Sequence, residues 1–317
     1  MERKKTVQYV TIDNDRVGQR IDNFLISALG KIPKACVYRW LRKGEVRVNK
    51  KRIKQTYRLQ ESDIVRIPPM FFDEQISEKK LKNYNFSYLE KLIIYEDNDF
   101  MILNKPHGLA VHGGTGINIG LIEQLKHIRP NEKKLELVHR LDRDTSGCIL
   151  IAKKYSILVY FHQQLRDRKI IKNYHALVYG AWLNSNTSIN KPLKKFVPKS
   201  GERFVRVHPD GKESITTVSV LKRFNNCTLV NASPKTGRTH QLRVHLQSEG
   251  HPILGDVKYS REEFDNEFIK FGLKRLFLHA NELIFTLPNC NTVRSFTASY
   301  DNSLSNMISN LEQECSI

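Results

Sequence analysis

Apolar residues recur at helical spacing near the start of the chain, where four of them mark one helix face: Ile21, Phe24, Leu25 and Leu29. A second helix is predicted to open at Pro33 and to end at Gly44, because Pro favours a helix start and Gly the position after the last turn. Alternating apolar and polar residues over 46–49, a turn, and further apolar residues as far as 67 predict a small β hairpin. Residues 18–68 therefore form a compact unit of two helices and a hairpin.

Short apolar runs characterise the chain from residue 92 onward. The runs 92–95 and 100–103 flank a polar turn, as in a hairpin. Further strands are predicted over 148–152, 174–179, 214–223, 227–232 and 276–286, and amphipathic helices near 156–168 and 238–248. Many short strands and few helices indicate an α+β domain built on a mixed or antiparallel sheet.

The segment between these two units is polar and begins at a pair of prolines, Pro68 and Pro69. A chain of 317 residues is long enough for two domains. We expect an N-terminal extension over 1–17, a small α+β domain over 18–76, a linker over 77–91 and the larger domain over 92–317. An extended strap that packs on either domain is an equally good interpretation of the polar segment.

The charge of the chain is strongly positive and unevenly distributed. It carries 52 Lys and Arg against 33 Asp and Glu, a formal net charge of +19. Residues 1–60 alone hold 16 of these cations and 5 of these acids. General richness in Lys explains part of the excess, but not its concentration at one end. A polyanionic partner is therefore expected, either nucleic acid or an acidic membrane surface.

The apolar stretches and the cysteines indicate the cellular compartment in which the protein is expected to work. No stretch approaches about 18 consecutive apolar residues, and the N-terminus does not resemble a signal peptide, so no membrane span is expected. The five Cys residues, at 36, 148, 227, 290 and 315, are far apart, which argues against a disulfide framework or a Cys-rich zinc site. We expect a protein of the reduced cytoplasm.

The most informative motif runs from Leu137 to Gly147. It places Asp142 directly after His139-Arg140-Leu141, and turn-forming residues over 145–147 follow. Apolar runs on both sides predict strands, so the loop would present this carboxylate to a cleft. Many Asp residues in turns only bond their own backbone, and that interpretation stays open for Asp142 considered alone.

Two further segments could meet this loop. A strand predicted to start near 172 carries Tyr174, and the polar run 236–240 leads into a helix that carries Arg243. His240 and Arg243 would share one face of that helix. Taken alone, Tyr174 would be a core aromatic residue and Arg243 a surface charge. Only their occurrence together with the Asp142 loop makes them candidates.

The basic N-terminal unit resembles an S4-type RNA-binding domain over the segments 20–25 and 37–49. Family members usually carry Gly-Asp where this chain has Ser62-Asp63. The resemblance implies that basic side chains of this unit bind RNA, and four are candidates: Arg39, Arg42, Lys43 and Arg47.

The larger unit resembles the RluA family of pseudouridine synthases. His-Arg-Leu-Asp-x-x-Thr-Ser-Gly (139–147) and Gly-Arg-Thr-His-Gln-Leu-Arg (237–243) are long motifs whose joint match by chance is improbable. Segments 104–108 and 250–256 also resemble the family, and 41–52 and 111–114 resemble a subgroup that acts on large-subunit (23S) ribosomal RNA. The resemblance implies the pseudouridine synthase fold, an intramolecular isomerase and a ribosomal RNA substrate.

The resemblance also implies roles for the site residues. Asp142 would act at C1′ of a uridine extruded from the RNA, either by attack on C1′ or by removal of a sugar proton. Arg243 would ion-pair with Asp142 and orient it, and Tyr174 would stack on the detached uracil. Four residues would contact the RNA around the extruded uridine: Arg140, His139, Arg238 and His240. Arg140 would also fill the gap that the uridine leaves. No metal and no cofactor is expected, and the protein is expected to be a monomer without membrane attachment.

Two other functions compete with this one. A magnesium-dependent phosphotransferase would use Asp142 or Asp144, but it needs a further acidic pair for the metal, and the chain has no adjacent Asp-Asp. A non-catalytic RNA-binding or ribosome-assembly protein explains the charge and the first domain equally well. It leaves the joint occurrence of Asp142, Tyr174 and Arg243 unexplained.

Overall fold

The computed structural model describes residues 6–29, 32–69, 85–113, 119–132, 134–197, 204–288, 290 and 292–314. The chain forms two compact units, with the main boundary in the sequence between Asn85 and Phe86. Most of the expected linker over 77–91, and the expected domain boundary at 76, lie outside the described residues. Each unit has its own hydrophobic core.

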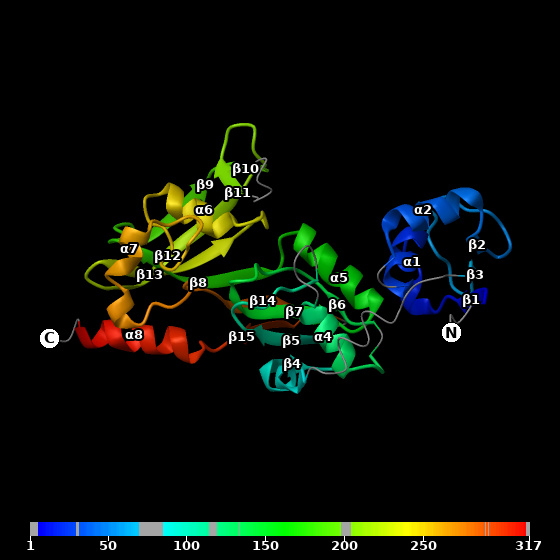
Figure 1. Ribbon diagram of the computed structural model, residues 1–317, viewed down its shortest axis with the longest axis horizontal. Helices are drawn as coiled ribbons and strands as arrows, with labels where there is room; N and C mark the ends of the chain where they lie inside the picture. The colour runs from blue at the N-terminus through cyan, green and yellow to red at the C-terminus, as the bar shows by residue number, and fades with distance from the viewer. Residues whose placement is uncertain are drawn as a thin grey trace. The chain divides into compact units, whose positions relative to one another are not determined.

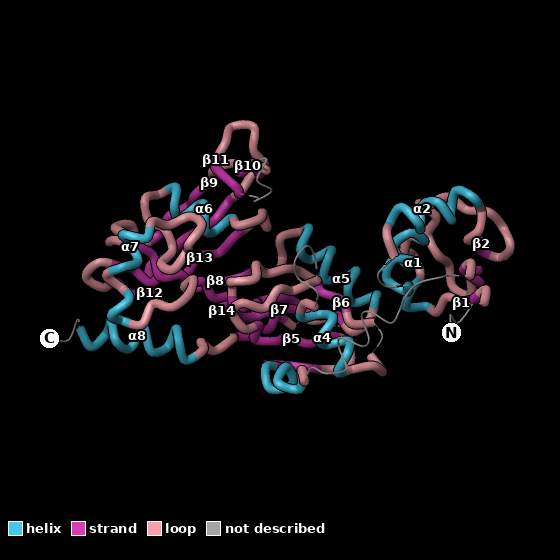
Figure 2. Tube along the Cα trace, viewed as in Figure 1, coloured by secondary structure: helices cyan, strands magenta, loops and turns pink. Residues whose placement is uncertain are grey.

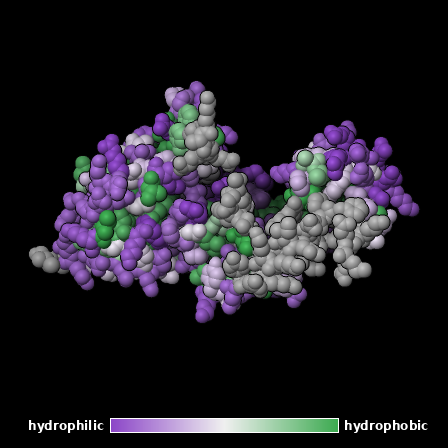
Figure 3. Space-filling view, in the orientation of Figure 1, coloured by the Kyte–Doolittle hydropathy of each residue, from purple (hydrophilic) through white to green (hydrophobic). Residues whose placement is uncertain are grey.

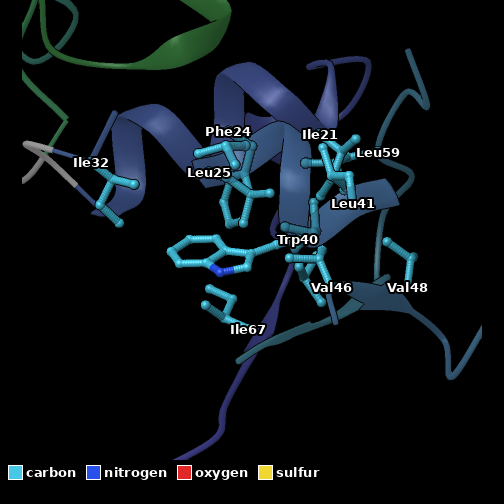
Figure 4. Packing of buried hydrophobic residues seen from close by; sticks show 13 residues of the cluster. Ile21, Phe24, Leu25, Ile32, Trp40, Leu41, Val46, Val48, Leu59 and Ile67 are labelled. Atoms are coloured by element: carbon cyan, nitrogen blue, oxygen red, sulfur yellow. The ribbon is translucent and has the colours of Figure 1, made fainter. Parts of the chain in front are cut away.

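The smaller unit packs two helices, α1 (Ile21–Leu29) and α2 (Lys34–Lys43), against a three-stranded sheet of β1 (Gln8–Thr11), β2 (Arg47–Val48) and β3 (Ile64–Ile67) (Figure 1). A short 3-10 helix, η1 (Asn14–Arg16), precedes α1. Figure 4 shows the Trp40 ring of α2 among apolar side chains of α1 and β3. Pro33 directly precedes α2, and Gly44 takes the left-handed conformation that ends it. Both predicted helices are confirmed.

The sheet of this unit differs from expectation at its edges. The strand order is β1-β3-β2, so residues 8–11 belong to the folded unit although a polar lead-in is expected there. Val10 packs against the core and Ile12 behind it is buried. A strand of four residues with one inward apolar side chain gives too short an alternation to be recognised in the sequence.

Asp63 fixes the turn that leads into β3. The side chain is buried, and its two oxygens accept hydrogen bonds from Asn49 Nδ2, the Tyr57 hydroxyl and the Gln60 N–H at 2.7–3.0 Å. Ser62 before it has a φ of +65°, in the left-handed region that favours glycine. This geometry explains why S4-type domains usually carry Gly-Asp at these two positions.

The strands of the larger unit are β4 (Ile93–Glu96), β5 (Phe100–Lys105), β6 (Glu136–Leu137), β7 (Ser146–Ala152), β8 (Ile171–Tyr179), β9 (Asn186–Asn190), β12 (Ile215–Arg223), β13 (Cys227–Pro234), β14 (Leu278–Thr286) and β15 (Val293–Thr297). They form one ten-stranded sheet with the order β4-β5-β7-β14-β8-β13-β12-β9, to which β15 adds beside β14 and β6 beside β7 (Figures 1 and 2). β7 and β14 run parallel and the other paired strands antiparallel. The expected α+β fold with a mixed sheet is confirmed.

A separate hairpin of β10 (Leu193–Phe196) and β11 (Phe204–Val207) projects from this unit (Figure 1). The helices are η2 (Ser87–Leu92), α4 (Leu121–Ile128), α5 (Tyr155–Arg166), α6 (Gln241–Ser248), α7 (Glu262–Asn266), η3 (Ile269–Phe271) and α8 (Asn302–Glu314). Aromatic rings join α5 to the sheet, where Phe161 packs edge-on against Phe100 and Phe285 with centroids 5.1–5.4 Å apart. Within the described residues, no helix is both long and apolar enough to cross a membrane.

The surface in Figure 3 is hydrophilic over most of the described area, with scattered apolar residues. Scattered apolar side chains are normal for a protein that is solvated in water.

Gly147 at the start of β7 is a position where a side chain should not fit. Its φ is +108°, and a Cβ there would lie 2.3 Å from the Ala280 carbonyl oxygen on β14. We expect Gly147→Ala to destabilise the larger unit by about 2–4 kcal/mol, because backbone strain and steric overlap add. Calorimetric melting would detect this as a lower Tm. Gly250→Ala is the matched control, since Gly250 has a φ of +85° but no non-neighbouring heavy atom within 4 Å of the added Cβ. Equal losses in the two variants would contradict this account.

Candidate active site

Asp142 lies in the loop between β6 and β7. The Thr145 N–H donates to the Asp142 carbonyl oxygen at 3.2 Å, which closes the turn that the sequence predicts. Thr145 and Ser146 are buried behind the loop, whereas Asp142 keeps 22% of its side chain exposed. The loop therefore directs its carboxylate outward and its hydroxyl-bearing residues inward.

Lys105 at the end of β5 ties this loop to the segment that follows β5. Its side chain is fully buried, and its ammonium donates to the carbonyl oxygens of Pro106, Leu109 and Arg143 at 2.8–3.0 Å. Burial lowers the pKa of Lys105 to about 7, although two nearby carboxylates act in the opposite direction. Three carbonyl acceptors match the three N–H groups of an ammonium, so this geometry holds the charged form.

Two neighbours of Lys105 strengthen the same connection. The Gly108 N–H donates to the Arg143 carbonyl oxygen at 3.0 Å. His107 Nδ1 lies 2.8 Å from the Asp144 carbonyl oxygen and must be its donor, since a carbonyl only accepts. The residues that flank Asp142 on its C-terminal side are thus fixed through their backbone.

His139 anchors the N-terminal side of the loop. Its Nε2 accepts a hydrogen bond from the Leu150 N–H of β7 at 3.2 Å. Burial lowers the pKa of His139 to about 3, so the ring is neutral. This nitrogen supports the loop, and an RNA contact by His139 stays a prediction.

Tyr174 occupies β8 beside the loop. Its paired positions on the adjacent strands are both alanines, Ala232 of β13 and Ala280 of β14, so the neighbours add little bulk around the ring. The side chain is 9% exposed. Burial raises the pKa of Tyr174, and the charge of Asp142 raises it further, so Tyr174 is a neutral phenol.

A buried amide network fixes the start of α6. Gln241 Oε1 accepts hydrogen bonds from the Thr236 hydroxyl and the Arg238 N–H at 2.8–3.0 Å. Gln241 Nε2 donates to the Ile215 carbonyl and the Thr216 hydroxyl of β12 at 2.9–3.0 Å. All four hydrogen-bonding positions of the amide are used, so the loop before α6 is held firmly on the sheet.

Arg243 on α6 pairs with Asp256 in a buried, two-pronged contact. Its Nε and Nη2 each lie 2.7 Å from a carboxylate oxygen of Asp256. Its guanidinium also lies 4.9 Å from the ring centroid of Tyr259. Burial acts to lower the pKa of Arg243, but Asp256, with a smaller contribution from Asp142, raises it overall. The expected ion pair of Arg243 with Asp142 is replaced by this one, because the buried carboxylate of Asp256 matches both guanidinium nitrogens.

His240 is the residue that faces Asp142. Its Nε2 lies 3.9 Å from Asp142 Oδ2. The Tyr259 hydroxyl accepts from the Val205 N–H at 3.0 Å and lies 2.7 Å from His240 Nδ1, so it is placed to donate its own hydrogen to that nitrogen. Burial lowers the pKa of His240, against the opposing effect of Asp142. A neutral ring whose Nδ1 accepts carries its proton on Nε2, directed at the carboxylate.

A single cavity of about 490 Å³ joins these segments. This volume falls in the range of about 300–1,000 Å³ that is usual for ligand pockets. Its lining includes seven of the residues expected from the sequence: His139, Arg140, Asp142, Tyr174, Arg238, His240 and Arg243. Arg140 and Arg238 are exposed. Asp142 is the one carboxylate in a lining that also contains Arg166, Arg168, Lys172 and Lys235, so the cavity is suited to a polyanion that carries a cationic reaction centre.

The chain is similar to known proteins over nearly its full length. The sequence profile described as RNA pseudouridylate synthase matches residues 99–248, and the S4 domain profile matches residues 19–65. A curated relative from Haemophilus influenzae, named ribosomal large subunit pseudouridine synthase C, is 50% identical over 97% of this chain and 96% of its own length. The chain belongs to the RNA pseudouridylate synthase family.

Other pseudouridine synthases support the same assignment. The Escherichia coli (strain K12) protein of the same name is 49% identical over 96% of this chain and 97% of its own length. Among solved structures, human RNA pseudouridylate synthase domain containing 4 is 26% identical with a TM-score of 0.59, over 71% of this chain and 95% of that one. The expected family, its enzyme class and the S4 domain are confirmed.

The candidate RNA-binding residues of the S4 domain lie on its surface. Arg39, Arg42, Lys43 and Arg47 are all exposed. Arg42 lines a surface cavity of about 460 Å³ together with Arg52 and Lys54. This concentration of exposed cations on the small S4 domain is suited to phosphate contacts.

Sequence reasoning missed the partners that support the catalytic candidates of this synthase. Lys105, Asp256 and Tyr259 were assigned no role, although Lys105 and Asp256 lie in segments that resemble the family. Their importance arises from contacts across the fold, which spacing along the chain does not reveal.

Asp256→Asn tests the buried ion pair of the synthase. Arg243 would stay charged without its counterion, so we expect a loss of about 3–5 kcal/mol in the free energy of unfolding. Thermal melting would show the loss. Glu312→Gln serves as the control, because Glu312 pairs with Lys222 on the surface at 2.6 Å and its loss should cost about 1 kcal/mol or less. A similarly small loss for Asp256→Asn would contradict the role given to this pair.

Proposed function

We propose that this protein converts uridine to pseudouridine in large-subunit (23S) ribosomal RNA, with Asp142 acting at the sugar C1′. The observation that carries the proposal is the single carboxylate of Asp142 in a cavity otherwise rich in cations, beside the ring of Tyr174. The relatives named ribosomal large subunit pseudouridine synthase C support the choice of RNA.

The reaction itself is an isomerisation. The C1′–N1 bond of uridine breaks, a C1′–C5 bond forms, and the proton of C5 is replaced by one on N1. Electrons balance within the nucleotide, so no oxidant or reductant is required. The chemical demand on the protein is to stabilise positive character at C1′ and to retain the detached base while it turns.

Asp142 meets the first demand. A carboxylate beside C1′ either attacks that carbon, stabilises its positive charge, or removes a sugar proton. The backbone ties of its loop to Lys105 hold the carboxylate in place before substrate arrives. His240 Nε2, at 3.9 Å, orients Asp142 in the role first expected of Arg243.

Tyr174 meets the second demand by stacking on uracil. Its buried ring offers an aromatic face, and base–aromatic stacking is worth about 1–3 kcal/mol. Because burial keeps the pKa of Tyr174 high, the phenol is suited to stacking and to donating a hydrogen bond, and less suited to accepting the C5 proton.

The target uridine must leave its stack to reach Asp142. A stacked nucleotide hides its glycosidic bond, and extrusion costs a few kcal/mol. Arg140 and Arg238, both exposed and both lining the cavity, would contact the neighbouring phosphates, and Arg140 would fill the gap left by the uridine. The S4 domain would contribute further phosphate contacts.

We also propose that the protein acts as a monomer and that it acts in the cytoplasm. The residues assigned to the reaction all line one cavity within one chain, so a single copy is sufficient. Ribosomal RNA as the substrate accounts for the cytoplasmic setting.

Asp142→Asn should abolish pseudouridine formation while leaving RNA affinity nearly unchanged, because the amide keeps the shape of the side chain but lacks its charge. Purified protein would be incubated with large-subunit ribosomal RNA transcript in EDTA, and pseudouridine mapped. Asp144→Asn is the control, since Asp144 lies in the same loop and pairs with Arg143 at the surface. Substantial turnover by Asp142→Asn would refute its assignment. Wild-type RNA binding without product would favour an assembly factor, and a metal requirement would favour a phosphotransferase.

A triple variant, Arg39→Gln with Arg42→Gln and Arg47→Gln, tests the S4 domain. Each lost phosphate contact should reduce the slope of log affinity against log salt by about 0.7–0.9, because fewer counterions are released. Filter binding at several salt concentrations measures the slope, and turnover at saturating RNA should stay unchanged. An unaltered slope would show that these arginines do not hold RNA.

A further inference from the structure

The larger unit holds one fully buried lysine, Lys105, and one partly buried lysine, Lys172, and their surroundings differ. Lys105 gives each of its three N–H groups a carbonyl acceptor. Lys172 on β8 has no hydrogen bond and no ion pair with any residue that the structure describes. A partly buried cation without a partner loses some hydration and gains no compensating contact, so it does not stabilise the fold.

Lys172 lies close to the residues that we assign to the reaction. It precedes Tyr174 by two positions on β8, so both side chains fall on the same face of the sheet, and both line the cavity. Burial lowers the pKa of Lys172, and no carboxylate offsets this effect, whereas Asp144 and Asp142 do so at Lys105.

The cavity around Lys172 is mostly cationic. The cavity lining holds Arg166 and Arg168 from the end of α5 and Lys235 from the loop after β13. His139, the titratable neighbour whose pKa the charge of Lys172 lowers further, is neutral. Asp142 is the one carboxylate of this lining, so the end of the cavity around Lys172 is suited to an anion.

The ammonium of Lys172 lies close to a glycine of the loop before α6. A Cβ built on Gly237 would have Lys172 Nζ as its nearest neighbour, at 4.0 Å. The loop from Thr236 to Arg238 therefore passes in front of the ammonium at a residue without a side chain. The side of the ammonium that faces Gly237 is therefore not covered by a side chain of that residue.

We propose that Lys172 is a phosphate-binding subsite of the cavity, which pairs with a phosphate of the RNA strand next to the uridine that Asp142 acts on. This inference rests on the proposed function. A phosphate of the bound strand would be the counterion of Lys172, which has no ion pair with any described residue. Lys172 would then contribute to binding the extruded nucleotide, while Asp142 carries the chemistry.

Lys172→Met tests the subsite through stability and salt dependence together. We expect the Tm to stay equal or to rise, because a partly buried charge without a partner is removed. The RNA concentration for half-maximal single-turnover rate should rise about tenfold to hundredfold, as for loss of a charge-assisted hydrogen bond, with little change in the maximal rate. The salt slope should fall by about 0.7–0.9, the value for one phosphate contact.

Three further variants test whether Lys172 binds a phosphate or only stabilises the fold. Lys172→Arg keeps the charge and should restore the salt slope. Lys169→Met removes an exposed cation just before β8 and should leave affinity and slope near those of wild type. Lys105→Met should lower the Tm, because it leaves three buried carbonyl oxygens without a donor.

The outcomes distinguish this inference from the function on which it rests. If Lys172→Met lowers the Tm as much as Lys105→Met does, then Lys172 stabilises the fold. That result would overturn the proposal that Lys172 binds phosphate. Weakened binding with an unchanged salt slope would show that Lys172 contacts a neutral group, such as a uracil oxygen, and would also overturn it. If wild-type protein forms no pseudouridine, the proposed function fails, and filter binding of the same variants to the same transcript still decides whether Lys172 holds a phosphate.

Discussion

The ammonium of Lys105 is the constraint on which the rest of the site depends. By donating to three carbonyl oxygens, it joins the end of β5 to the loop that carries Asp142. The loop has few regular backbone hydrogen bonds of its own, so its shape is set by such ties. A catalytic carboxylate must be positioned before substrate arrives if it is to stabilise charge without reorganisation. The fold therefore uses a buried cation to fix the backbone and leaves the acid free to act.

A second chain of contacts reaches Asp142 from the opposite wall of the cavity. Asp256 holds Arg243, the Arg243 guanidinium packs on Tyr259, and the Tyr259 hydroxyl sets the proton of His240 that faces Asp142. Arg243 thus acts on Asp142 through Tyr259 and His240 and not by a direct ion pair. A neutral imidazole next to Asp142 adds an N–H donor without a full positive charge, which leaves the carboxylate able to respond to positive character at the sugar.

Much of this could be predicted from local patterns. The helix that opens at Pro33 and ends at Gly44, the strands on both sides of Asp142 and the turn at Thr145 all follow from spacing and turn chemistry. Short or irregular elements could not: β1 has four residues, and the β10–β11 hairpin has no clear alternation. α8 does carry Leu304, Met307 and Leu311 at helical spacing and was overlooked. The pairing of Arg243 with Asp256 was beyond reach, because two carboxylates compete for one guanidinium and only the three-dimensional arrangement decides between them.

The central claim is that the Asp142 carboxylate meets C1′ of an extruded uridine. The most direct measurement is a crystal structure of the protein with a ribosomal RNA fragment whose target uridine is replaced by 5-fluorouridine, which has no C5 proton to lose. The account predicts a flipped nucleotide in the cavity, with an Asp142 oxygen within bonding or contact distance of C1′ and the base against Tyr174. A nucleotide that remains stacked in the RNA, or one bound with its sugar remote from Asp142, would contradict it.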